Sequence, residues 1–316
     1  MKEIGGYLEF ENLYGESYHP KAIALNCGRS CLAYLIETKK IKKLYLPYYL
    51  CNSIRKCCER YGVSYDYYHI DKSFKPIIDN LDSDEYILIV NYWGVLKPDY
   101  IKELKQRFRN IIVDNTQAFF EQPVGGVDTF YVARKFFGVP DGAYLYTDAR
   151  IKRELIREKG LNGMTHILGR YECTADDYFK EYHKSEARFN GIEIRLCSKI
   201  TENLLRAVDY DKVRNIRNNN FNILAEQLNN NNLLKVGNTN GAYMYPLFVE
   251  DGEKIKKSLI RKKIYVPTLW EEVYEICDKT DIEYQFTKNI VLLPVDQRYT
   301  TEDMRYIAQI INKVLG

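Results

Sequence analysis

Short apolar runs that alternate with longer helical patterns most constrain the fold of this chain. Tyr86–Tyr92 and Asn110–Val113 are almost continuously apolar, which is typical of strands buried on both faces of a sheet. Between them, Tyr100–Phe108 has helical spacing. Other strands are predicted at Lys43–Leu46, Val63–Tyr68, Thr129–Ala133 and Ala143–Tyr146, and helices at Ser30–Thr38 and Asn52–Tyr61. This order predicts an α/β fold with a mostly parallel mixed sheet flanked by helices.

The second part of the chain has a different pattern. After Asp148 it is charged and helical, and then a shorter alternation begins. There we expect helices at Lys199–Val208, Val213–Leu228, Glu253–Lys262 and Thr301–Val314, and strands at Tyr243–Val249, Ile264–Val266 and Ile290–Leu293. A chain of 316 residues is long enough for two domains. We therefore expect a large domain over residues 1–214 and a smaller α/β domain over residues 215–316.

Charge and cysteine content exclude several classes of protein. The net charge of +3 lacks the strongly basic footprint of a nucleic-acid-binding protein. The N-terminus is charged and no apolar run is long enough to span a bilayer, so we expect neither a signal peptide nor a membrane partner. The cysteines and histidines lack the spacing of metal ligands or of a disulfide scaffold. These features predict a cytoplasmic protein with reduced thiols and no metal site.

The turn Asn26-Cys27-Gly28-Arg29-Ser30 opens a predicted helix. The first amides of a helix have no intrahelical acceptor and lie at the positive end of the helix dipole. Such a turn can bind an anion, although many turns of this composition only begin a helix. Both interpretations are open for this segment.

Two titratable residues follow predicted strands. Asp114 ends the run NIIVD, and ligands of open α/β sheets bind at the carboxyl ends of strands. Capping of the next segment is an equally good explanation for this carboxylate. Lys135 lies between the apolar segments Thr129–Ala133 and Phe136-Phe137, which is an unusual place for a solvated charge. We expect partial desolvation to lower the pKa of Lys135 and make it a nucleophile toward carbonyls.

An anion-binding turn, a strand-end aspartate and a partly desolvated lysine are the three groups that pyridoxal 5'-phosphate (PLP) requires. In these features the chain resembles the DegT/DnrJ-type sugar aminotransferases, which are fold-type I PLP-dependent enzymes. The resemblance covers most of the chain. Its specific parts are the segments IIVDNTQAFF and ARKFFGVPDGAYLY, and weaker matches are NCGRSCLAYLIE, VNYWG and LPVDQRYTTEDM.

The resemblance implies a role for three residues around the cofactor ring. Lys135 would be the catalytic residue, forming a Schiff base with PLP and shuttling a proton to and from the substrate α-carbon. Asp114 would pair with the pyridinium nitrogen. Gln117 would donate a hydrogen bond to the phenolic oxygen of the cofactor.

The resemblance also implies how the rest of the cofactor is held. Gly28, Arg29 and Ser30 would bind the phosphate. An aromatic ring would stack on the cofactor, and in this role we expect Tyr49 rather than its neighbour Tyr48.

The implied reaction is ping-pong transfer of an amino group from a glutamate-like donor to a nucleotide-linked ketosugar, as in nucleotide-sugar metabolism and polysaccharide biosynthesis. By the same resemblance, the enzyme would be a homodimer with its active site at the subunit interface. Trp270 is a candidate for a wall of the substrate site, and an ordinary core position is as good an explanation for it.

Two departures from the family pattern leave alternatives open. The family has a phosphate-binding serine shortly before the lysine, where this chain has Val132 and Ala133. The family also has a Gly-x-Asn-x-Arg segment, and in Gly191–Arg195 the asparagine is replaced by Glu193. A catalytically silent binding or scaffold paralogue is therefore one alternative. A PLP-dependent sugar dehydratase is another, but Lys135 argues against it because those relatives have histidine at this position.

Overall fold

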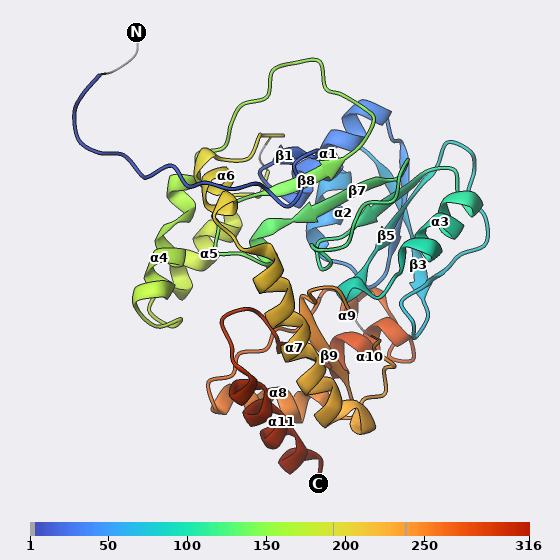
Figure 1. Ribbon diagram of the computed structural model, residues 1–316. Helices are drawn as coiled ribbons and strands as arrows, with labels where there is room; N and C mark the ends of the chain where they lie inside the picture. The colour runs from blue at the N-terminus through green and yellow to red at the C-terminus, as the bar shows by residue number, and fades with distance from the viewer. Residues whose placement is uncertain (1–3, 192, 238) are drawn as a thin grey trace.

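The larger part of the molecule is built on an eight-stranded mixed sheet (Figure 1). The computed structural model describes residues 4–191, 193–237 and 239–316. The strands are β1 (Ile23–Leu25), β2 (Lys43–Pro47), β3 (Ser64–Ile70), β4 (Pro76–Ile77), β5 (Tyr86–Val90), β6 (Ile111–Asp114), β7 (Asp128–Val132) and β8 (Ala143–Tyr146), in the spatial order β1-β8-β7-β6-β5-β2-β3-β4. The pairs from β7 to β3 are parallel, and those that involve β8 and β4 are antiparallel. The predicted mostly parallel mixed sheet is thus confirmed.

Helices cover this sheet and make up much of the C-terminal part of the chain. They are α1 (Gly28–Lys39), α2 (Asn52–Arg60), α3 (Pro98–Arg107), α4 (Thr165–Glu172), α5 (Phe179–Ala187), α6 (Lys199–Arg206), α7 (Tyr210–Leu228), α8 (Gly252–Arg261), α9 (Val273–Ile276), α10 (Ile282–Asn289) and α11 (Thr301–Leu315). Among the described residues, no helix is long and apolar enough to cross a membrane.

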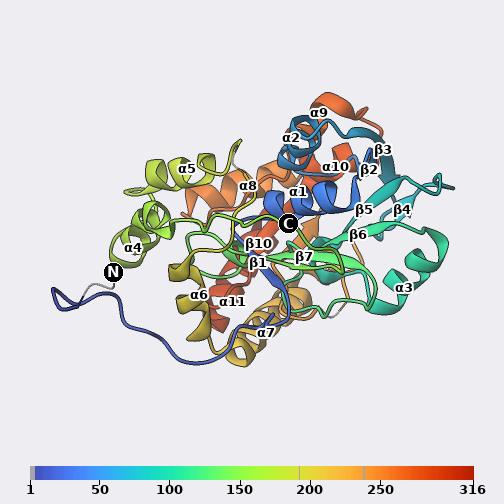
Figure 2. The same cartoon turned by 90° about the horizontal axis from the view of Figure 1, so that it is seen from above.

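The two faces of the large sheet bury different cores because successive side chains of a strand point to opposite sides. In β7, Phe130 and Val132 belong to the core under α1 and α2, which lie together on one side (Figure 2). Tyr131 belongs to an aromatic core on the other side, together with Phe119 and Phe137. The strand β7 is therefore buried on both faces.

A second core occupies the C-terminal part. Strands β9 (Met244–Phe248) and β10 (Ile290–Pro294) pair antiparallel and pack with α7, α8 and α11 (Figure 1). Helix α11 begins at a capping box in which Thr300 and Asp303 satisfy each other's backbone amides. The expected domain boundary between residues 214 and 215 falls inside α7 and stays a prediction.

The prediction of a strand at Ile264–Val266 is wrong. These residues have no regular secondary structure. The amide of Ile264 donates to the Leu259 carbonyl at the end of α8, and Lys263 before it is left-handed with a φ of 59°. The amide that would begin a strand ladder is thus used to close the preceding helix.

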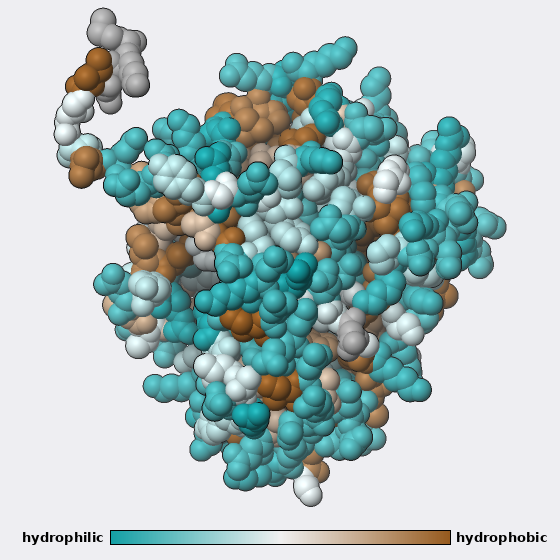
Figure 3. Space-filling model, in the orientation of Figure 1, coloured by the Kyte–Doolittle hydropathy of each residue, from teal (hydrophilic) through white to brown (hydrophobic). Residues whose placement is uncertain are grey.

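Helices α4 and α5 form a pair at one edge of the molecule, and the N-terminal segment runs away from the body (Figure 1). Apolar side chains gather over this edge (Figure 3), and the exposed ones there include Leu161, Leu168 and Phe179. The helical pattern expected after Asp148 begins only at residue 160, because residues 148–159 form an irregular connection.

Candidate active site

The parallel strands β2, β5, β6 and β7 are successive neighbours and end at one edge of the sheet, here called the carboxyl edge. Tyr49 follows β2, Tyr92 follows β5, Asp114 ends β6, and Lys135 follows β7. Ligands of open α/β sheets bind at such an edge. The topology therefore brings together residues that are scattered over more than a quarter of the sequence.

Asp114 is buried at the carboxyl edge. Its Oδ1 accepts a hydrogen bond from the Thr116 amide at 2.8 Å. The carboxylate therefore caps the following turn, which is one of the two roles that the sequence allows. Desolvation raises the pKa of Asp114 to about 6, against the opposing effects of Thr116 and of the positive charge of Lys135. A carboxylate in this state would be stabilised by a bound cation, so capping and ligand binding are compatible here.

Gln117 lies beside the end of β5. Its Oε1 accepts a hydrogen bond from the Trp93 amide at 3.3 Å, and the side chain is buried. Since the carbonyl oxygen is used in this way, the amide nitrogen is the group that can donate to a ligand. The predicted contact of Gln117 with a cofactor stays a prediction.

Lys135 ends a short 3₁₀ turn, Ala133–Lys135, and its side chain is accessible to solvent. The expected lowering of its pKa is wrong. The charges of Tyr243 and Glu186 raise the pKa of Lys135, and they outweigh both desolvation and the repulsion from Arg134. In the absence of a bound group, Lys135 is therefore a protonated, accessible amine.

The first turn of α1 lies against the end of β7. A Cβ atom on Gly28 would come within 3.0 Å of Val132, so glycine permits this close approach. The helix begins at Cys27, which makes no side-chain capping bond within the described residues. The amides of Gly28 and Arg29 are thus available to an anion close to the Lys135 turn, whereas that of Ser30 donates to the Cys27 carbonyl at 3.0 Å.

Both the amide and the hydroxyl of Ser30 have partners, and the amide donates to the Cys27 carbonyl at 3.0 Å. Its hydroxyl donates to Asn26 Oδ1 at 2.6 Å, and the residue is buried. Binding of a phosphate by this hydroxyl, which stays a prediction, would require it to rotate away from Asn26.

Three arginines surround the buried ring of Phe189 beside this turn, and we call them the Phe189 cluster. The guanidinium carbons of Arg188, Arg134 and Arg29 lie 4.4, 4.5 and 5.9 Å from the ring centroid. Arg134 forms a bidentate ion pair with Glu186, at 2.6 and 3.0 Å. The sequence predicted only Arg29 of this group, and only through its backbone.

The Phe189 cluster contains buried N–H groups without acceptors. Arg29 donates to Asn190 at 2.7 Å, and Arg188 donates to the Pro140 carbonyl. However, Nε of Arg134 and both Nε and Nη1 of Arg188 are buried and have no hydrogen-bond partner in the described part of the chain. The nearest carboxylate to Arg188 is Glu158, at 3.7 Å. Unsatisfied cationic donors beside a helix N-terminus form a set that suits an anion.

The segment that carries Glu193 runs beside the same turn. The carbonyl of Arg195 accepts a hydrogen bond from the Asn26 amide at 3.0 Å. Glu193 itself is exposed, and Ile192 lies outside the described residues. The role of Glu193 in place of the family asparagine stays open.

The two tyrosines after β2 have different surroundings. Tyr49 is buried against Tyr92 and Trp270, with ring centroids 5.5 and 4.8 Å away. Tyr48 stacks on Tyr67. Trp270 therefore packs across the two parts of the molecule at the carboxyl edge rather than inside the second core. Stacking of Tyr49 on a cofactor stays a prediction.

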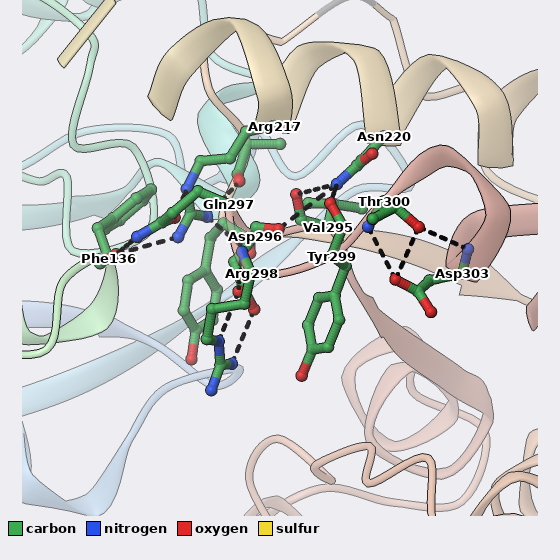
Figure 4. A network of polar contacts seen from close by, with 12 residues as sticks. Phe136, Arg217, Asn220, Val295, Asp296, Gln297, Arg298, Tyr299, Thr300 and Asp303 are labelled. Atoms are coloured by element: carbon green, nitrogen blue, oxygen red, sulfur yellow. Dashed lines mark hydrogen bonds and ion pairs between the residues drawn. The ribbon is translucent and has the colours of Figure 1, made fainter. Parts of the chain in front are cut away.

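The C-terminal part also reaches the Lys135 turn, at the carbonyl of Phe136 (Figure 4). This carbonyl accepts hydrogen bonds from Gln297 Nε2 at 2.8 Å and from Arg217 Nη2 at 3.2 Å. Arg217 comes from α7 and is buried. We call Phe136, Arg217 and Gln297 the Phe136 junction. Sequence reasoning missed Arg217, since a lone arginine in a charged helix has no distinguishing pattern.

Of the comparisons with known proteins, the one with solved structures identifies the fold. No family model and no curated protein matches the chain. Among solved structures, it resembles a DegT/DnrJ/EryC1/StrS aminotransferase from Brucella abortus, with a TM-score of 0.64 and 13% identity over 92% of this chain and 85% of that one. A protein of Streptococcus pneumoniae assigned as a sugar aminotransferase, in its PLP-form, has a TM-score of 0.64 and 14% identity over 95% and 89%. The chain has the fold of these aminotransferases.

Within this aminotransferase fold, three of the residues predicted from sequence, Gly28, Asp114 and Lys135, come near one another. The carboxyl edge carries Asp114 and Lys135, whose charges act on each other, and Gly28 packs against the strand that leads to Lys135. The third similar structure, CalS13 from Micromonospora echinospora, is also a sugar aminotransferase, with a TM-score of 0.64 and 13% identity over 93% and 88%. The predicted aminotransferase architecture is thus confirmed.

Proposed function

We propose that this chain is a PLP-dependent aminotransferase that transfers an amino group from a glutamate-like donor to a nucleotide-linked ketosugar. One observation carries the proposal: Asp114, Lys135 and the first turn of α1 meet at the carboxyl edge of a sheet with the sugar aminotransferase fold. The S. pneumoniae protein was solved in a PLP-form and a PMP-form, which supports PLP as the cofactor here.

The residues at the carboxyl edge fit PLP. Its phosphate requires donors, and the first amides of α1 and the unsatisfied N–H groups of Arg134 and Arg188 supply them. Its ring nitrogen requires an anion, and Asp114 is a buried carboxylate. Its aldehyde requires an accessible amine, and Lys135 is exposed. The Phe189 cluster therefore supplies donors that the missing serine does not.

When bound, PLP supplies an electron sink for amino-group chemistry. Lys135 would attach the cofactor and then carry a proton at Nζ to and from the substrate carbon. Asp114 would be held ionised by a cation beside it, since an adjacent positive charge lowers a carboxyl pKa. Gln117, oriented by the Trp93 amide, would donate from its side-chain nitrogen. These roles require no other group from the protein.

A homodimer is part of the proposal. The exposed apolar side chains over α4 and α5, among them Leu168 and Phe179, lie close in sequence to the Phe189 cluster (Figure 3). Exposed apolar patches are typical of protein interfaces. Sedimentation of the purified protein should show a dimer, and a strictly monomeric protein would contradict this part.

The decisive experiment is covalent trapping of the cofactor. Purified protein loaded with PLP should absorb visible light, and borohydride reduction followed by mass spectrometry should place the adduct on Lys135. Lys135→Ala should lose the band, whereas Lys184→Ala, on the exposed side of α5, should retain it. A colourless wild-type protein that cannot be loaded with PLP would refute the enzyme proposal.

The substrates require a second measurement. Glutamate should change the spectrum of the loaded protein in a first half-reaction. Nucleotide-linked ketosugars, added one at a time, should then reverse the change. Reversal by simple keto acids alone would argue against a sugar acceptor.

A further inference from the structure

The Phe136 junction fixes the backbone next to Lys135 from both sides. The Phe136 amide donates to the Ala133 carbonyl at 2.9 Å, which closes the turn that carries Lys135. The Phe136 carbonyl accepts from Arg217 and Gln297 (Figure 4). Both polar backbone groups of the residue after Lys135 are therefore held, one by the large sheet and one by the C-terminal part.

Arg217 also holds the segment that contains Tyr243. Its Nη1 donates to the carbonyls of Ala242 and Tyr243, at 2.9 and 3.4 Å. The ring of Tyr243 lies 5.8 Å from that of Phe136, and the Tyr243 phenol is the largest influence on the pKa of Lys135. One guanidinium thus joins the backbone next to the lysine to the backbone of its main electrostatic neighbour.

Burial of Arg217 has a high desolvation cost, and the junction offsets it with hydrogen bonds. Its remaining donor, Nε, binds Gln297 Oε1 at 2.9 Å, so each of its three nitrogens has an acceptor. The guanidinium carbon lies 4.6 Å from the centroid of the Phe136 ring. Gln297 is bound to Arg217 through its oxygen and to Phe136 through its nitrogen, which fixes its orientation. This arrangement determines the position of Phe136 more closely than a single contact would.

We propose that Arg217 and Gln297 are positioning residues that hold Lys135 opposite Tyr243 by fixing the Phe136 carbonyl. The role of Lys135 as the cofactor-binding amine rests on the proposed function. The position of Lys135 relative to Tyr243 does not, and it can be measured without cofactor. Besides Tyr243, the charged and titratable groups that act on Lys135 are Glu186, Arg134, Tyr182 and Asp114.

Gln297→Glu is the sharpest variant. The new carboxylate keeps an oxygen for Arg217 Nε but cannot donate to the Phe136 carbonyl. Arg217→Met removes all guanidinium contacts at similar volume, and Arg217→Lys restores a cation with fewer donors. Arg214→Met is the matched control, because Arg214 lies on the same helix and pairs with the exposed Asp211 at 2.7 Å.

The first readout is competitive acetylation of Lys135 in cofactor-free protein across pH, followed by mass spectrometry with Lys184 as internal reference. By charge alone, the new carboxylate of Gln297→Glu and the loss of the Arg217 cation would each raise the pH midpoint of Lys135. We expect the displacement of Lys135 from Tyr243 to outweigh this effect and to lower the midpoint by about 0.5 in both variants. Arg217→Lys should recover part of the shift, and Arg214→Met should match wild type. The second readout is retention of PLP on dialysis, which should fall about threefold to tenfold in the same two variants.

Unchanged or raised midpoints together with unchanged PLP retention in Gln297→Glu would overturn the proposal, even if the melting temperature fell. If Arg217→Met does not fold, Gln297→Glu decides the question alone. If wild-type protein does not bind PLP at all, the proposed function fails, and the acetylation midpoints still test the positioning of Lys135.

Discussion

The buried phenylalanines Phe136 and Phe189 each have an arginine over the ring, and the two arginines differ in their hydrogen bonds. Arg217 lies 4.6 Å above Phe136 and every nitrogen of its guanidinium has an acceptor. Arg188 lies 4.4 Å above Phe189, and two of its buried nitrogens have none. A satisfied buried arginine stabilises a scaffold, whereas an unsatisfied one indicates a place for a ligand.

Asp114 resembles Arg188 rather than Arg217 in this respect. It is buried, and its pKa is raised to about 6 because desolvation is only partly offset by Thr116 and Lys135. The carboxyl edge therefore holds a carboxylate and cationic donors that would gain from bound partners. The Phe136 junction holds a cation that already has its partners. This contrast predicts opposite effects of substitution in the two regions.

The largest expected effect is the loss of stability in Arg217→Met. The substitution leaves the Ala242 carbonyl and Gln297 Oε1 without their cationic donor, and unsatisfied buried acceptors cost about 1–3 kcal/mol each. We expect the free energy of unfolding to fall by about 3–4 kcal/mol, measured by urea denaturation. Arg214→Met should change it by less than about 0.5 kcal/mol, since that ion pair is largely solvated. An equal, small effect of both variants would remove the distinction between the two regions.

The carboxyl edge could be predicted from the sequence because its signals are local. Asp114 ends an apolar strand, Gln117 follows in the next turn, and Lys135 stands between apolar segments. The parallel pairing of β6 with β7 then brings the ends of both strands to one edge. The direction of the Lys135 pKa shift could not be predicted, because it depends on Tyr243, which is distant in sequence.

The burial of Arg217 and of Arg188 could not be predicted from the sequence, for the same physical reason. Arg217 and Arg188 stand in charged helical stretches where most arginines are solvated, and only tertiary packing shows which are buried. The predicted strand at Ile264–Val266 failed because its first amide closes α8. The sequence of the short strand β1 has no recognisable pattern, and the strand forms because it pairs with β8. In each case a distant or competing hydrogen bond decided the structure.

The next largest effect is a gain in stability from Asp114→Asn in cofactor-free protein. The folded pKa of about 6 lies above the ordinary value of 3.8, so this group stabilises the fold at low pH. That contribution is lost as the pH rises from about 4 through 6. Above pH 7, Asp114→Asn should therefore be more stable than wild type by about 2 kcal/mol, by denaturation at a series of pH values.

The control for this substitution is Asp84→Asn, at an exposed carboxylate. It should leave the pH dependence of stability as in wild type. A variant at Asp114 that is less stable than wild type above pH 7 would show that the carboxylate is already satisfied by Thr116, and Asp114 would then belong with Arg217.

The smallest effect, and the most specific for the Phe189 cluster, is expected for Arg188→Met. Without ligand, its stability should fall by only about 1 kcal/mol, because the Pro140 carbonyl loses its donor whereas the other two removed nitrogens are unsatisfied and the methionine replaces their volume. Inorganic phosphate should raise the melting temperature of cofactor-free wild type, and Arg188→Met should need about tenfold more phosphate for the same rise. Arg170→Met removes an exposed arginine from α4 and should respond like wild type. If phosphate protects Arg188→Met and wild type equally, the unsatisfied nitrogens of Arg188 do not mark an anion site. The anion would then be bound by the first turn of α1 with Arg29 and Arg134 alone.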